Sequence, residues 1–109
     1  MDITCTLSNN RALVGLSGRM DAVTAPAFEQ HCESLITQGT TAVIADMSGL
    51  KYISSAGLRS ILSSAKKLRT AGGNLSFCGM TGMVDEVFRV SGFFKMFRVF
   101  ATKDEALAE

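Results

Sequence analysis

The stretch that decides the fold is AVIADMSGLKYISSAGLR, residues 42–59. It opens with a nearly unbroken apolar run, Ala42 to Ala45, which is typical of a central strand covered on both faces. The segment from Asp46 to Arg59 is expected to leave this strand, make a short connection and enter a helix, which begins at Ser54 and Ser55. In open α/β sheets, a connection at the carboxyl end of a strand is the usual place for a binding site. The middle of the chain therefore predicts a buried strand, a helix and a candidate site between them.

The residues before this stretch predict a β-hairpin and one helix. Residues 2–8 alternate apolar and polar side chains, the period of a strand with one wet face, and the apolar ones are Ile3, Cys5 and Leu7. The turn residues Ser8-Asn9-Asn10 lead into a second strand over residues 11–18. From Thr24, which can cap a helix, apolar residues recur at helical spacing until Gly39 ends that helix.

The residues after Ser55 predict the remaining helices and strands. A second helix runs to Gly72-Gly73, strands follow at residues 74–79 and 97–100, and helices at residues 83–91 and 103–109. The inward stripe of the second helix is Leu58, Ile61, Leu62, Ala65 and Leu68. The order β-β-α-β-α-β-α-β-α predicts a single α/β domain over residues 1–109. Its sheet is mixed and mostly parallel, with about five strands, an N-terminal hairpin and about four helices packed on it.

Composition excludes several classes of protein. Eleven basic and ten acidic residues give a formal charge of +1, so the charge of a general nucleic-acid binder is missing. Cys5, Cys32 and Cys78 share no metal-ligand spacing with one another or with His31, so we expect no metal site or cofactor. We expect all three thiols to be buried or half-buried, and His31 to lie on a helix surface. No apolar segment approaches the ~20 residues that cross a bilayer, so we expect a cytoplasmic protein without membrane insertion.

The serine pair at the start of the second helix has two interpretations. Serine is common there because its hydroxyl accepts a hydrogen bond from a free backbone N–H, so the pair can be an ordinary cap. A phosphate would also be well accommodated, because free N–H groups and the helix dipole favour an anion. It would add about −1.5 to −2 charges and weaken any interface packed against it, while the domain stays folded. The same residues therefore fit a binding switch.

Motifs of catalysis are missing. The chain has no Gly-rich phosphate-binding pattern and no dinucleotide fingerprint, and Ser55 lacks the G-x-S-x-G setting of a hydrolase. His31 belongs to the middle of the first predicted helix, and nothing places it near Ser55 as a base. We therefore expect a protein that is not an enzyme.

Two motifs resemble those of a known family. The segments DMSGL at residues 46–50 and ISSAGL at residues 53–58 resemble the signature of the STAS family, which includes bacterial anti-sigma factor antagonists. The segment GRMDA at residues 18–22 is similar to the second hallmark of that family. The resemblance implies a cycle in which the unphosphorylated protein binds an anti-sigma factor that is also a serine protein kinase, which releases a sigma factor. Phosphorylation by that kinase then ends the binding, and a PP2C-type phosphatase restores it.

The resemblance also implies site residues. By position in the motif, Ser55 is the expected phosphorylation site, with Ser54 as the alternative, because many relatives have Asp where this chain has Ser54. Asp21 and Asp46 match acidic positions of the family and are expected on loops near the same edge of the sheet. The expected partner-binding residues are Asp21, Asp46, Ser54, Ser55, Ala56, Gly57 and Arg59. Each carboxylate could instead only satisfy backbone N–H groups, and Arg59 could be a solvated charge.

The alternative function is a STAS domain that is not phosphorylated. Such a domain would serve as a scaffold or regulatory subunit of a stress-signalling or membrane-transport complex. Phosphate on Ser55, and its effect on binding, would discriminate between the two functions. A small hydrolase or nucleotide-binding enzyme ranks below both, because the serine has no evident base.

Overall fold

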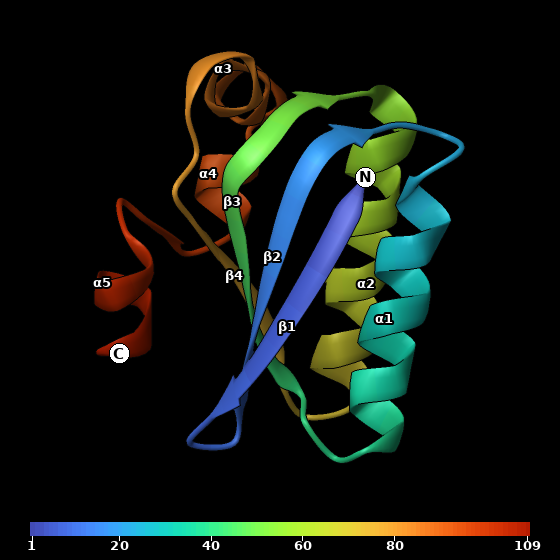
Figure 1. Ribbon diagram of the computed structural model, residues 1–109, viewed down its shortest axis with the longest axis vertical. Helices are drawn as coiled ribbons and strands as arrows, with labels where there is room; N and C mark the ends of the chain where they lie inside the picture. The colour runs from blue at the N-terminus through green and yellow to red at the C-terminus, as the bar shows by residue number, and fades with distance from the viewer.

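The computed structural model describes residues 1–109 and contains one five-stranded sheet, in the order β1-β2-β3-β4-β5 (Figure 1). The strands are β1 (Asp2–Ser8), β2 (Arg11–Met20), β3 (Ala42–Ile53), β4 (Asn74–Cys78) and β5 (Val99–Phe100). The helices are α1 (Ala25–Thr37), α2 (Ser55–Thr70), α3 (Gly82–Ser91), α4 (Phe93–Met96) and α5 (Lys103–Leu107). Strand β1 is antiparallel to β2, and the other neighbours are parallel. The predicted mixed α/β fold with its N-terminal hairpin is confirmed.

The turns lie where the sequence predicts them. Asn9 and Asn10 both have positive φ, 51° and 63°, as a two-residue hairpin turn requires. Gly92, with φ 82°, ends α3 and separates it from the one-turn helix α4, so the third predicted helix is followed by a further short one.

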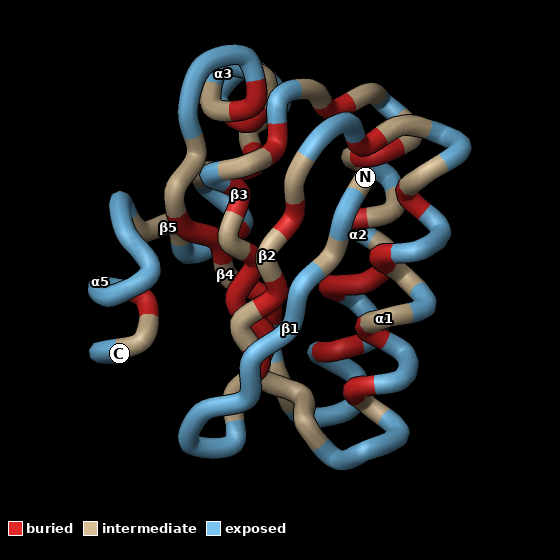
Figure 2. The backbone as a smooth tube through the Cα atoms, viewed as in Figure 1, coloured by how far each residue is buried: buried red, intermediate tan, exposed pale blue.

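The core lies mainly on one face of the sheet. Helices α1 and α2 cover this face, and buried residues fill the space between them and the strands (Figures 1 and 2). Phe28 of α1, Val14 of β2 and Ile61 of α2 are fully buried there. Each such apolar side chain stabilises the fold by about 1.5–3 kcal/mol. The opposite face carries α5, over a separate small cluster of Ile44, Cys78 and Ala106.

Strand β3 is longer than expected. The strand was expected to end before Asp46, but β3 continues to Ile53, and the connection to α2 is the single residue Ser54. The pairing of β2 with β3 extends to Met20 and Ile53, with two register shifts between Gly15 and Arg19. These irregularities let Met47, Leu50 and Ile53 all be buried, although they are three residues apart. The period of two is therefore lost, and the strand resembles a loop in the sequence.

Several expected burials are wrong. Cys5 is exposed and Leu7 is 60% exposed, because β1 is the edge strand and most of it is open to solvent (Figure 2). In α2, Leu62 is 37% exposed and Ser64 is fully buried. His31 is half-buried, and its Nε2 atom is enclosed without a hydrogen-bond partner. Cys32 and Cys78 are buried as expected.

None of the helices is both long and apolar enough to cross a membrane.

Candidate functional site

The start of α2 is built around Ser54. Its backbone N–H donates to the Met20 carbonyl at 3.0 Å, which joins the end of β3 to the end of β2. Its extended backbone makes it the N-cap, and its Oγ accepts a hydrogen bond from the Gly57 N–H at 3.2 Å. The half-buried Ser54 hydroxyl is therefore committed to the cap.

Ser55 is the first residue of α2 and differs from Ser54 in exposure and in hydrogen bonding. Its side chain is exposed and makes no hydrogen bond within the protein. Because Ser55 and Ala56 open the helix, their backbone N–H groups have no partner within it. The hydroxyl of Ser55 is thus free, and it stands beside free donors at the positive end of the helix dipole.

Gly57 brings α2 close to the end of β2. A Cβ atom on this residue would lie 2.8 Å from Cγ1 of Ile53 and 2.9 Å from the carbonyl oxygen of Met20. No side chain fits in that space without displacing the backbone of β2. Gly57 is buried, so it positions Ser55 through the backbone and offers no side chain to a partner.

Asp21 forms the turn between β2 and α1, next to the start of α2. Its carboxylate accepts hydrogen bonds from the backbone N–H groups of Val23 at 3.0 Å and of Thr24 at 3.1 Å. The Thr24 N–H is the main cause that lowers the pKa of this carboxyl group. Thr24 occupies the N-cap position of α1 as expected, but its hydroxyl donates to the Arg19 carbonyl at 2.8 Å and makes no cap bond. Asp21 therefore fixes a turn that holds Val23, 87% exposed, at its tip.

Asp46 lies elsewhere, and its expected place near Asp21 is wrong. It sits within β3, opposite Cys78, and accepts a hydrogen bond from the Ser48 N–H at 3.1 Å. It lies seven positions before Ile53, a path of about 23 Å at the usual rise of a strand. Because β3 extends past the end of β4, the carboxyl ends of neighbouring strands do not coincide here. Asp46 shapes the backbone near Gly79 and is not part of the site at α2.

An apolar groove adjoins Ser55 and was not predicted from the sequence. It lies between α2 and α3 and has a volume of about 460 Å³. Its lining residues are Leu58, Met83, Glu86, Val87, Val90 and Ser91. Leu58 stands one turn after Ser55, and Val90 is 84% exposed. The sequence does contain a signal for this groove: α3 has more apolar residues than one buried helix face can hold.

Basic side chains surround the same end of the molecule. The Arg19 guanidinium lies over the Tyr52 ring, 4.0 Å from its centroid, as cross-strand neighbours on β2 and β3. Arg59 is exposed one turn along α2 from Ser55 and forms no ion pair. The structure thus brings Asp21, Ser54, Ser55 and Arg59 to one end, with an apolar groove beside them.

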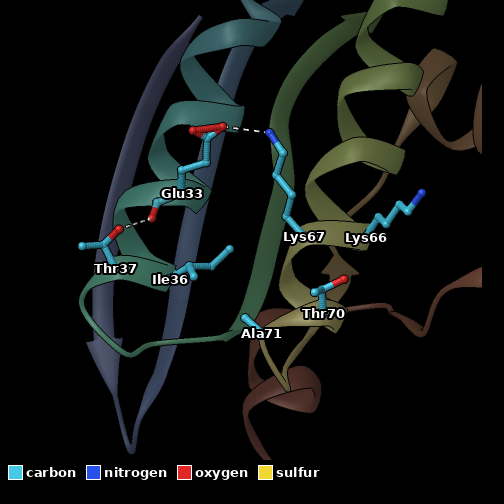
Figure 3. A pocket seen from close by; sticks show the side chains of 7 residues that line it. All are labelled: Glu33, Ile36, Thr37, Lys66, Lys67, Thr70 and Ala71. Carbon is cyan, nitrogen blue, oxygen red and sulfur yellow. Dashed lines mark hydrogen bonds and ion pairs between the residues drawn. The ribbon is translucent and has the colours of Figure 1, made fainter.

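The largest cavity lies at the other end of α2 (Figure 3). It has a volume of about 540 Å³ and opens between α1 and α2, where Lys67 Nζ pairs with Glu33 Oε1 at 2.8 Å. Lys66 and Lys67 follow Ser55 by eleven and twelve residues, which is about 17 Å along a helix. This cavity is therefore separate from the candidate site. No group of three His, Cys, Asp or Glu residues lies close enough to hold a metal ion.

Comparison with known proteins connects this geometry to one group. A family model described as the STAS domain matches residues 3–106. BtrV of Bordetella bronchiseptica, a provisionally assigned anti-sigma factor antagonist, is 34% identical over 108 residues, which cover 99% of this chain and 93% of BtrV. The crystal structure of an anti-sigma factor antagonist from Mycobacterium paratuberculosis has a TM-score of 0.87 and 25% identity, and covers 98% of this chain and 91% of that one. The Bacillus cell fate determinant SpoIIAA in its phosphorylated form has a TM-score of 0.77 and 20% identity, with 98% and 97% covered.

Proposed function

This chain belongs to the STAS domain family, and from that premise we propose that it is an anti-sigma factor antagonist controlled by phosphorylation of Ser55. The unphosphorylated protein binds an anti-sigma factor that is also a serine kinase, and a sigma factor is released. Phosphate on Ser55 ends the binding, and a phosphatase of the PP2C class removes the phosphate. The chain is a binder and a substrate, and it catalyses no step of this cycle.

The observation that carries the proposal is the free, exposed hydroxyl of Ser55 at the first position of α2. A kinase must reach the hydroxyl oxygen, and a phosphate must find donors once it is attached. Ser55 meets both conditions, because nothing covers it and the first N–H groups of α2 are unpaired. Ser54 meets the first condition less well, since its hydroxyl is half-buried and already accepts the Gly57 N–H. The geometry therefore favours Ser55 over Ser54 as the acceptor.

The surroundings of Ser55 explain how a phosphate would end binding. Val23 and the groove at Leu58 and Val90 provide apolar surface for a partner to cover. A phosphate among these side chains carries about −1.5 to −2 charges, which an interface would have to desolvate. The Asp21 turn and the Ser54 cap do not use the Ser55 hydroxyl, so we expect them to hold this surface in the same shape in both states. Binding is lost although the fold is kept.

The relatives give independent support. BtrV and the Mycobacterium paratuberculosis protein are both assigned as anti-sigma factor antagonists, and both match this chain over nearly its whole length. The phosphorylated form of SpoIIAA keeps this fold, so a protein with this architecture tolerates a phosphate.

The proposal is tested by mass spectrometry of the protein from its own cells. Trypsin releases the peptide YISSAGLR, residues 52–59, which contains Ser54 and Ser55 and no other hydroxyl except that of Tyr52. Fragmentation between the two serines is expected to place one phosphate on Ser55. Absence of phosphate under every growth condition would overturn the switch and favour the scaffold function.

A binding experiment tests the mechanism with a matched pair of variants. Ser55→Ala is expected to retain a protein kinase from cell extract, and Ser55→Asn to retain it nearly as well. Ser55→Asp has the same size as Ser55→Asn but adds a charge, and we expect it to bind at least about tenfold more weakly, because an unpaired charge in an interface is costly. Equal binding of the Asp and Asn variants would contradict the role of charge.

A further inference from the structure

Strand β1 is an exposed edge without the usual protection. It is the outermost strand of the sheet, and it is seven residues long. Its register with β2 is continuous from Asp2 to Ser8, without a bulge. It contains no Lys, Arg or Pro, and Asp2 at its start is its one charged residue. Natural proteins usually block an open edge with such residues or with a bulge, because its free N–H and C=O groups attract another strand.

The sequence of β1 is complementary to itself when it is reversed. The strand DITCTLS, residues 2–8, is centred on Cys5. If two copies run antiparallel with full overlap, Cys5 lies opposite Cys5, Thr4 opposite Thr6, and Ile3 opposite Leu7. Apolar pairs and Thr–Thr pairs directly opposite each other stabilise antiparallel strands. We propose that β1 pairs in this register with β1 of a second copy of this chain, about a two-fold axis at Cys5.

The backbone allows this register. In an antiparallel pair, alternate residues direct both their N–H and C=O groups to one neighbour, and the residues between them direct theirs to the other side. The free groups of β1 therefore belong either to its odd or to its even residues. Full overlap pairs odd residues with odd ones and even residues with even ones. In both cases free groups face free groups, and the two sheets become one sheet of ten strands.

The side chains favour the same register. Leu7 is 60% exposed in one copy and would lie against Ile3 of the second copy. Asp2 would lie opposite Ser8, and the two Asp2 carboxylates would lie at opposite ends of the pair, so no like charges meet. The interface is small, which places it among weak, reversible associations. It includes neither the Asp21 turn nor the groove between α2 and α3, so each copy keeps its site open for a partner.

Sedimentation velocity over a range from micromolar to millimolar protein, with a reductant present, tests the association. We expect a reversible dimer whose dissociation constant rises at least about tenfold in Cys5→Lys, because two like charges would then lie directly opposite each other. Thr70→Lys adds the same charge at an exposed position of α2 and is expected to leave the dimer unchanged. A chain that stays monomeric at millimolar concentration, or an equal effect of both variants, would overturn the proposal.

Cross-linking tests the register without depending on Cys5→Lys. Two thiols lose two electrons and two protons to added diamide, which becomes its hydrazine, and one S–S bond forms. Native Cys5 is expected to give a covalent dimer, since the other two thiols are buried. In a Cys5→Ser background, Thr4→Cys or Thr6→Cys alone is expected to cross-link poorly, because equal positions then lie too far apart for a disulfide. An equimolar mixture of these two variants is expected to cross-link well. Equal yields at positions 4, 5 and 6 would exclude the register.

Discussion

Adjacent serines at the start of α2 differ in what their hydroxyl groups do. Ser54 closes the helix by accepting the Gly57 N–H, whereas Ser55 keeps its hydroxyl free. A phosphate on the capping oxygen would change the group that accepts this N–H, whereas a phosphate on the next residue leaves the cap unchanged. The structure therefore separates the group that stabilises the helix from the group available for modification.

This division predicts different costs for two neighbouring alanine variants. Ser54→Ala is expected to lower the free energy of unfolding by about 1 kcal/mol, because the cap is lost. Ser55→Ala is expected to change it by less than about 0.5 kcal/mol, as for an ordinary exposed residue. Denaturant unfolding of both variants and the native protein measures the difference. A larger loss in Ser55→Ala than in Ser54→Ala would contradict the assignment of the cap.

The Asp21 turn predicts a pH dependence. Its hydrogen bonds to backbone N–H groups lower the pKa of the carboxyl group in the folded protein below its ordinary value of 3.8. The charged form therefore stabilises the fold above pH 3.8, and this contribution is lost as the pH falls through the folded pKa. We expect the native protein to be more stable than Asp21→Asn at neutral pH. In urea unfolding at a series of pH values, the gap between the two should close in acid; a constant gap would argue against this role.

At the scale of elements, sequence patterns correctly predicted the helices and turns that depend on interactions between residues close in the chain. The hairpin, α1 and α3 follow from the Asn turn, the helical spacing of apolar residues and Gly92, which all act within a few residues. The length of β3 did not follow, because its last residues are held by pairing with β2, and the register shifts hide its alternation. The groove beside Ser55 also escaped prediction, since it depends on how α3 packs against α2. The predicted position of Asp46 was wrong because the prediction ended β3 too early, so that Asp46 was assigned to a loop.

Helix α5 is predicted to open independently of the core. It covers a small cluster separate from the main one, and the Arg11 guanidinium donates to the carbonyls of Ala106 and Leu107. Burial raises the pKa of Cys78, beneath α5, to about 11 and that of Cys32, on the buried face of α1, to about 12. In Arg11→Gln, we expect faster reaction of Cys78 with an aromatic disulfide reagent and no change at Cys32.

Two comparisons make this experiment specific. Arg69→Gln removes an exposed arginine of α2 that does not contact α5, and should leave both rates unchanged. Equal acceleration of both buried thiols in Arg11→Gln would mean that the whole protein is destabilised, and independent opening of α5 would then be excluded.

At the scale of the whole molecule, the proposed phosphorylation is expected to change charge far more than shape. The formal charge of the chain is +1, so one phosphate changes its sign. The phosphorylated protein is expected to have a net charge of about −1, because a phosphate adds about −1.5 to −2. It should elute later from an anion exchanger, with an unchanged sedimentation coefficient at low concentration and an unchanged circular dichroism spectrum. A change in the spectrum would show that the phosphate acts by unfolding a segment.

The contact of Gly57 with Met20 and Ile53 bears on how such a protein diverges. The placement of Ser55 depends on a position that has no room for a side chain, so we expect a substitution of Gly57 to displace this serine. Val23 and Arg59 are exposed near Ser55 and do not take part in the contact between Gly57, Met20 and Ile53. Under the proposed function, substitutions at Val23 and Arg59 are therefore expected to change which partner binds without moving Ser55.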